Sequence, residues 1–135
     1  MQVIVDTNIL ISAIIRDRIP EEVISFIIQN PEIEWVASKE ILKEYNEVLG
    51  RKKFGLSADT VADWKNIFRE LVTVEVPDNN LNFPRDPKDT CFLACAAQTG
   101  AEYLITGDKD LRSIEKFTGT KIISAAQFKK TVMKA

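Results

Sequence analysis

Residues 1–8, which read MQVIVDTN, decide the fold expected for this chain. Residues 3–5 are a β-branched apolar run that is too short for a helix and typical of a buried strand. The run ends at Asp6, and residues 9–15 continue as an almost unbroken apolar segment, which predicts a buried helix. In parallel α/β sheets, ligands bind at the carboxyl ends of the strands. Asp6 is therefore expected at such an end, either as a helix cap or as part of a site.

Length, composition and charge narrow the classes of protein that this chain can belong to. The 135 residues are expected to form one domain over 1–135, and 45% hydrophobic with 28% charged residues is ordinary for a globular protein. No apolar run reaches the roughly 18 residues of a membrane span, and the start lacks the pattern of a signal peptide, so we expect a cytoplasmic location. A net charge of −2 excludes a strongly basic nucleic-acid binder, although local basic clusters can still hold phosphates.

The absence of histidine limits the chemistry. It removes the commonest general base and the usual zinc ligand. Any metal must rely on oxygen ligands, which suit Mg²⁺ or Mn²⁺. Cys91 and Cys95 lie four residues apart in an apolar segment without CxxC spacing, so we expect them to be small buried hydrophobes.

A helix predicted over residues 39–49 carries three glutamates. At about 100° per residue, Glu44 lies closest to the apolar arc, whereas Glu40 and Glu47 lie farther round, toward water. Glu44 is therefore the acid expected at the edge of the core. Without the other acids of the chain, an ordinary boundary glutamate would be the better interpretation.

Residues 85–90, which read RDPKDT, precede a segment (91–97) that is apolar all round and must be buried. Asp86 can cap the helix, Pro87 suits its first position, and Asp89 falls in its first turn, where a negative charge complements the helix dipole. However, Asp89 projects from a side of the helix that carries large apolar residues, so it is expected to point into the protein or a cleft.

A second buried strand, predicted over residues 103–106, ends shortly before Asp108, as the first strand ends before Asp6. The order of elements predicts a parallel sheet with helices on both faces. In such a sheet Asp6 and Asp108 share one edge, and the helix that carries Asp89 begins nearby. Like charges brought together cost stability unless a cation neutralises them, which indicates Mg²⁺ or Mn²⁺. One or two such ions can activate water and stabilise an in-line phosphoryl displacement.

The sequence resembles the PIN-domain family of ribonucleases, which includes many bacterial and archaeal toxins of toxin–antitoxin pairs. The resemblance rests on residues 3–8, the helix of Glu44, residues 86–89 and residues 103–111, in family order over almost the whole chain. It implies a three-layer α/β/α sandwich whose mainly parallel five-stranded sheet has the order 3-2-1-4-5.

The resemblance also implies which residues act. The family's catalytic, metal-binding acids fall on Asp6, Glu44, Asp89 and Asp108. Asp110 matches a position that is acidic in some members and is a further candidate metal ligand. Asn8 and Thr106 match residues that orient acids and water, whereas Asp86 either supports the site or only caps a helix. The implied reaction is cleavage of single-stranded RNA that depends on Mg²⁺ or Mn²⁺ and needs no side-chain nucleophile.

Seven basic residues are candidates for contacting RNA phosphates, although each could be ordinary solvated surface: Arg51, Lys52, Lys53, Arg85, Lys88, Lys109 and Arg112. The leading hypothesis is an endoribonuclease that acts as the toxin of a toxin–antitoxin pair. The alternatives are a ribonuclease of RNA processing or decay without an antitoxin, and a catalytically silent module that binds RNA or a protein. The expected partner is single-stranded RNA, and an antitoxin and a second copy of the chain are further candidate partners.

Overall fold

The structure is a computed structural model, which describes residues 1–75 and 87–134. For residues 87–90 it describes the backbone but not the side chains. Its centre is a six-stranded sheet with the order β3-β2-β1-β4-β6-β5. The strands are β1 (Gln2–Val5), β2 (Glu34–Ser38), β3 (Val72–Glu75), β4 (Tyr103–Ile105), β5 (Lys116–Phe117) and β6 (Thr120–Ile123).

The mainly parallel sheet predicted from the sequence is confirmed. Strands β3, β2, β1, β4 and β6 are parallel and lie in the predicted order. The predicted number of five strands is wrong by one. The additional strand is β5, which pairs with β6 in an antiparallel hairpin. Its two residues are too few to show a periodic pattern. Thr118 and Gly119, with φ of 49° and 92°, form the two-residue turn whose backbone suits such a hairpin.

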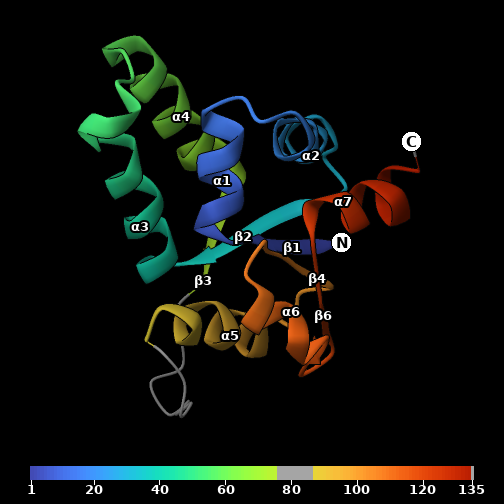
Figure 1. Ribbon diagram of the computed structural model, residues 1–135. Coiled ribbons are helices and arrows are strands. Elements are labelled where there is room, and N and C mark those ends of the chain that lie inside the picture. The colour runs from blue at the N-terminus through green and yellow to red at the C-terminus, as the bar shows by residue number, and fades with distance from the viewer. Residues whose placement is uncertain (76–86, 135) are drawn as a thin grey trace.

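Helices cover both faces of the sheet (Figure 1). On one face lie α1 (Thr7–Ile14), α2 (Arg18–Gln29), α3 (Lys39–Leu49) and α4 (Ala58–Leu71), with the short η1 (Lys52–Phe54) between the last two. On the other lie α5 (Pro87–Thr99) and α6 (Lys109–Ile114). From β1 through β2 to β3 the chain moves across the sheet in one direction, and from β1 through β4 to β6 the strands follow in the other direction. Because crossovers between parallel strands are right-handed, the two directions place their helices on opposite faces of the sheet. Within the part of the chain described, no helix is long and apolar enough to cross a membrane.

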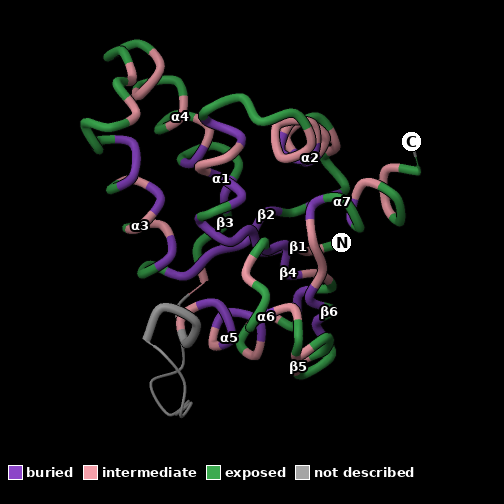
Figure 2. Tube along the Cα trace, in the orientation of Figure 1, coloured by how far each residue is buried: buried purple, intermediate pink, exposed green. Residues whose placement is uncertain are grey.

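The centre of the sheet is the core of the molecule. Val3, Ile4 and Val5 of β1 are completely buried, as the purple trace of β1 shows in Figure 2. A strand covered on both faces needs apolar residues at every position, which is why β1 reads as a continuous apolar run. Phe68 is buried in the same core, and Trp64 packs on it with ring centroids 6.1 Å apart.

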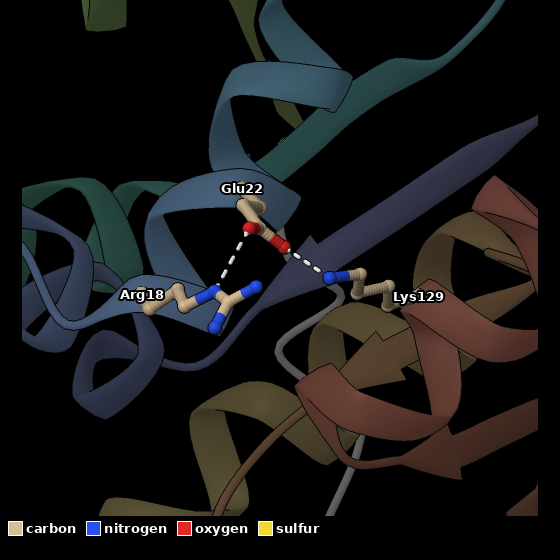
Figure 3. Close-up of polar contacts among 3 residues, drawn as sticks. All are labelled: Arg18, Glu22 and Lys129. Atoms are coloured by element: carbon tan, nitrogen blue, oxygen red, sulfur yellow. Dashed lines mark hydrogen bonds and ion pairs between the residues drawn. The ribbon is translucent and has the colours of Figure 1, made fainter. Parts of the chain in front are cut away.

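The end of the chain packs against α2. Ser124 and Gln127 form a capping box that begins α7 (Ala125–Phe128), which continues into η2 (Lys129–Met133). Lys129 binds the carboxylate of Glu22, which also contacts Arg18 at 3.5 Å (Figure 3). The hydrogen bond from Lys129 is the main reason that the pKa of Glu22 lies below its usual value. This contact joins the last helical segment to the first layer of helices.

Candidate active site

The topology of the sheet has a switch point between β1 and β4. These strands are hydrogen-bonded neighbours, and their register pairs Val5 with Ile105. After β1 the chain crosses one face of the sheet, and after β4 it crosses the other face. The two connections therefore separate at the carboxyl ends of β1 and β4, where open α/β sheets bind their ligands. Asp6 directly follows β1 at this point, and Asp108 follows β4.

A buried hydroxyl joins these two acids. Thr106 Oγ1 donates a hydrogen bond to Asp6 Oδ2 at 2.5 Å and accepts one from the backbone N–H of Asp108 at 3.0 Å. The backbone N–H of Asp6 donates to the carbonyl of Ile105 at 2.9 Å. Thr106 is completely buried, so water does not compete for these bonds. Thr106 thereby fixes the carboxylate of Asp6 relative to the start of the segment that carries Asp108.

Asp6 is a buried carboxyl group, only 5% exposed. Burial raises its pKa above the usual value, because an apolar surrounding disfavours the charged form. The hydrogen bonds from Thr106 and from the backbone of Asn8 act in the opposite direction, and the negative charges of Glu44 and Asp108 raise the pKa further. The three acids are therefore close enough for their charges to interact.

The glutamates of α3 lie as the helical pattern predicts. Glu44 is half-buried, whereas Glu40 and Glu47 are exposed. The charge of Glu44 also contributes to the raised pKa values of Asp6 and Cys91. The predicted orientation of Glu44 is confirmed, and its role as a metal ligand stays a prediction.

Helix α5 begins at the same edge of the sheet, because it follows the parallel strand β3. Asp89 is its third residue, and its side chain lies outside the described part of the structure, as does that of Lys88. Cys91, two residues farther on, is half-buried. Burial raises its pKa to about 12, and the charges of Glu44 and Asp6 contribute to the increase. Cys91 thus lies within range of the charges of these two acids, and the position of the Asp89 carboxylate stays a prediction. Asp86 and Arg85 fall outside the described residues.

Asp6 and Asp108 do cap helices, as considered from the sequence, and capping leaves lone pairs on their carboxylate oxygens. Asp6 Oδ1 accepts a hydrogen bond from the backbone N–H of Asn8 at 3.4 Å at the start of α1. Asp108 Oδ1 accepts from the N–H groups of Asp110 and Leu111, at 2.8 and 3.3 Å, at the start of α6. A carboxylate has two oxygens and about four lone-pair sites, so capping a helix does not prevent it from binding a cation. Asn8 and Asp110 are exposed beside the acids that they contact.

The chemistry of the donor groups fits Mg²⁺ or Mn²⁺. Within residues 1–75 and 91–134, no ion pair involves Asp6, Glu44 or Asp108, so no basic side chain there offsets their charge. Carboxylate oxygens are the ligands that these hard cations prefer. The described residues alone do not bring three carboxylates or thiols into a group that could hold an ion. Asp6, Glu44 and Asp108 are among those described residues, so a metal site that joins them with Asp89 stays a prediction.

Other polar groups lie at or near the site. The hydroxyl of Thr7, the residue after Asp6, is buried and has no hydrogen-bond partner among the described residues. The same holds for Arg112 Nε, on the helix that Asp108 caps. Lys109 is exposed at the first position of that helix. Of the basic residues proposed for RNA, Lys109 and Arg112 thus lie on the helix that begins at Asp108.

Arg51, Lys52 and Lys53 are not brought to the acids. They follow the carboxyl end of α3, and at 1.5 Å per residue Arg51 lies about 10 Å beyond Glu44 along the helix axis. Arg51 contacts Glu47 at 3.7 Å, and Lys53 lies 5.2 Å from the centre of the Phe54 ring. These three residues can contact RNA only where the RNA extends away from the acids.

Sequence reasoning overlooked the hydroxyl of Tyr45, which it treated only as part of an apolar arc. The side chain is completely buried, and its hydroxyl donates a hydrogen bond to the carbonyl of Val5. A signal was available, because a tyrosine in a buried arc needs a partner for its hydroxyl, whereas a phenylalanine does not.

A three-layer α/β/α domain with acids at the switch point of its sheet is the architecture expected of a PIN domain, and sequence comparison agrees. The family model described as PIN domain matches residues 2–110, a range that includes Asp6, Glu44, Asp89 and Asp108. The chain is also 31% identical over 118 residues to the uncharacterized protein MJ1680 of Methanocaldococcus jannaschii, a match that covers 84% of this chain and 75% of that protein. The chain therefore belongs to the PIN-domain family, whose members are generally nucleases.

Comparison with solved structures shows the same fold. A chain in the crystal structure of VapBC2 from Rickettsia felis, bound to a DNA fragment from their promoter, superimposes with a TM-score of 0.62. The match covers 92% of this chain and 98% of that chain, at 15% sequence identity. The arrangement of strands and helices is thus preserved where little of the sequence is.

Proposed function

We propose that this protein is a metal-dependent endoribonuclease that cleaves single-stranded RNA. The observation that carries the proposal is the buried carboxylate of Asp6, which Thr106 joins to the segment of Asp108 and on which the charge of Glu44 acts. A buried acid beside other acids lowers the stability of the folded state. Its presence despite this cost indicates a functional role. Membership of a family of nucleases supports the same conclusion.

The residues of the site have separate roles in this proposal. Asp6, Glu44, Asp89 and Asp108 hold Mg²⁺ or Mn²⁺, with Asp110 as a further candidate. When bound, the ion activates water and neutralises charge on the phosphate that is attacked. Thr106 holds the Asp6 carboxylate in one orientation, and its hydrogen bond favours the charged form needed for metal binding. Lys109 and Arg112 bind RNA phosphates next to Asp108.

The test is cleavage of a panel of cellular RNAs by the purified protein in Mg²⁺, in Mn²⁺ and in excess chelator. We expect cleavage of single-stranded regions with metal, none with chelator, and none from Asp6→Asn. Asp17→Asn is a matched control, because Asp17 also precedes a helix but makes no side-chain capping bond. Cleavage that persists in chelator, or that survives Asp6→Asn at the wild-type rate, contradicts the proposal.

We further propose that the enzyme is the toxin of a toxin–antitoxin pair. The fold shared with a chain of the VapBC2 structure and the family membership support this role. The antitoxin would place a tail over the acids of the site and present arginine or lysine to their carboxylates. Expression should arrest growth, and the neighbouring gene should relieve the arrest. A protein that is neither toxic nor bound by the product of a neighbouring gene would instead belong to RNA processing or decay.

The remaining expectations from the sequence are proposals as well. A single domain over 1–135, a cytoplasmic location and a homodimer stay predictions. A catalytically silent binding module is the least favoured alternative, because Asp6, Glu44, Asp89 and Asp108 are all present in the sequence. Loss of cleavage in every metal, with RNA binding intact, would favour it.

A further inference from the structure

The pairing of β1 is unequal on its two sides. Toward β4 the register extends to the last residue of β1, Val5. Toward β2 it ends at Val3, which pairs with Trp35. Backbone groups alternate in direction along a strand, and the carbonyl of Met1 accepts from Glu34, the first residue of β2, at 2.7 Å. By this alternation the carbonyl of Val5 faces the β2 side, beyond the end of the β1–β2 register.

A side chain from α3 occupies this position. The hydroxyl of Tyr45 donates a hydrogen bond to the carbonyl of Val5 and accepts one from Trp35 Nε1 at 3.3 Å. The ring packs against Trp35 and Phe68, with centroids 5.8 and 5.4 Å away. Tyr45 is completely buried, so its hydroxyl has no access to water as an alternative partner. Its position is therefore fixed by packing around the ring and by hydrogen bonds at the hydroxyl.

The two ends of this contact are the neighbours of two site acids. Tyr45 follows Glu44 in α3, and Val5 precedes Asp6 at the end of β1. One hydrogen bond thus connects the helix that carries Glu44 to the strand that ends at Asp6. The charges of both acids act on the Tyr45 hydroxyl, whose pKa lies well above its usual value mainly because of burial. The hydrogen bond from Tyr45 to Val5 consequently lies close enough to Asp6 and Glu44 for their charges to act on it.

We propose that Tyr45 is a positioning residue, which sets the separation of Glu44 and Asp6 by tying α3 to the carboxyl end of β1. The role assigned to the two acids, that of holding a divalent cation, rests on the proposed function. A phenylalanine would fill the same space but would leave the Val5 carbonyl and the Trp35 N–H without a partner. Helix α3 would then lose the contact that fixes it beside Asp6.

The experiment compares Tyr45→Phe with Thr120→Val. Thr120 is also completely buried, and its hydroxyl donates to the carbonyl of Ala101 at 2.5 Å. This bond lies at the amino ends of β4 and β6, the opposite edge of the sheet from the acids. Each variant therefore removes one buried hydroxyl that donates to a backbone carbonyl, but only Tyr45 borders the site.

We expect both variants to melt at lower temperature than the wild type, and only Tyr45→Phe to bind Mn²⁺ more weakly, by about 10-fold in calorimetry. Its kcat on RNA should fall at low Mn²⁺ and recover at high Mn²⁺, while its KM for RNA stays unchanged. In a Glu44→Gln background, Tyr45→Phe should cause no further loss of Mn²⁺ affinity, because it acts through Glu44. Equal Mn²⁺ affinities for Tyr45→Phe and Thr120→Val would overturn the proposal.

Failure of the proposed function gives a different result. If the wild type neither binds Mn²⁺ nor cleaves RNA, the metal-dependent function fails, and crystal structures of wild type and Tyr45→Phe decide the positioning role. A displacement of α3 from β1 supports that role, and an unmoved helix overturns it. If Tyr45→Phe does not fold, NMR of the wild type decides. The hydroxyl proton of Tyr45 should shift when Mg²⁺ is added, and an unshifted signal contradicts the proposal.

Discussion

Replacing Asp6 by asparagine should stabilise the metal-free protein at neutral pH. Burial raises the pKa of Asp6 above its usual value of 3.8, and the charges of Glu44 and Asp108 add to the effect. The folded state therefore binds the proton more tightly than the unfolded state. The stability that comes from this group is complete below the usual pKa and is lost as the pH rises through the raised value. An asparagine in its place would avoid that loss, because an amide is neutral at every pH in this range.

The expected size of the effect is the difference of two terms. The hydrogen bond from Thr106 to a carboxylate is charge-assisted, and its conversion to a neutral bond costs about 1 kcal/mol. Repulsion from the like charges of Glu44 and Asp108 is on the order of 1 to 2 kcal/mol at an effective dielectric of about 20, and burial of the charge adds to this penalty. Because the pKa of Asp6 is raised, the penalties exceed the benefit of the hydrogen bonds. We expect a net gain of about 1 kcal/mol, or about 4 °C in Tm for a chain of this size.

Thermal melts in chelator and in Mn²⁺ provide the assay. In chelator at about pH 7.5, Asp6→Asn should melt above the wild type, and the difference should narrow as the pH falls through the raised pKa of Asp6. Added Mn²⁺ should raise the Tm of the wild type and have little effect on the variant, since binding to the native state stabilises it. Asp17→Asn, at an exposed residue, should match the wild type. A lower Tm for Asp6→Asn in chelator, with an intact response to Mn²⁺, would show that Asp6 is an ordinary structural cap.

Further predictions concern the neighbours of Asp6. Glu44→Gln should lower the rate of RNA cleavage by about 100-fold, whereas Glu47→Gln, at an exposed residue, should lower it by less than about 2-fold. Equal losses in the same assay would show that the wrong face of α3 was assigned to the site. Thr106→Val should lower kcat by roughly 10- to 100-fold, because the Asp6 carboxylate loses the hydroxyl that orients it, and Thr106→Ser should restore most of the rate. With pKa values of about 12, Cys91 and Cys95 should react with iodoacetamide at about pH 8 only after unfolding, as mass spectrometry would detect.

The sequence alone determined the elements whose patterns are local. Three consecutive β-branched residues from Val3 to Val5 specify a strand buried on both faces, since no exposed strand tolerates an apolar residue at every position. The spacing of apolar residues in α3 turned Glu44 toward the core and left Glu40 and Glu47 outside. The capping box of Ser124 and Gln127 is a local pattern of the same kind, because its bonds span only three residues. The order of these elements was enough to predict the parallel strands and the edge at which Asp6 and Asp108 meet.

Tertiary structure decided the contacts that depend on distant parts of the chain. Thr106 and Asp6 are 100 residues apart, and their hydrogen bond exists only because β1 and β4 pair in one particular register. The bond from Tyr45 to Val5 likewise depends on the β1–β2 register ending early, a feature that no sequence pattern records. Such contacts arise from packing and register, which the whole fold determines, whereas helical periodicity and caps arise within a few neighbouring residues. The sequence thus specified which acids follow the carboxyl ends of β1 and β4, and the fold decided which buried hydroxyl orients the Asp6 carboxylate.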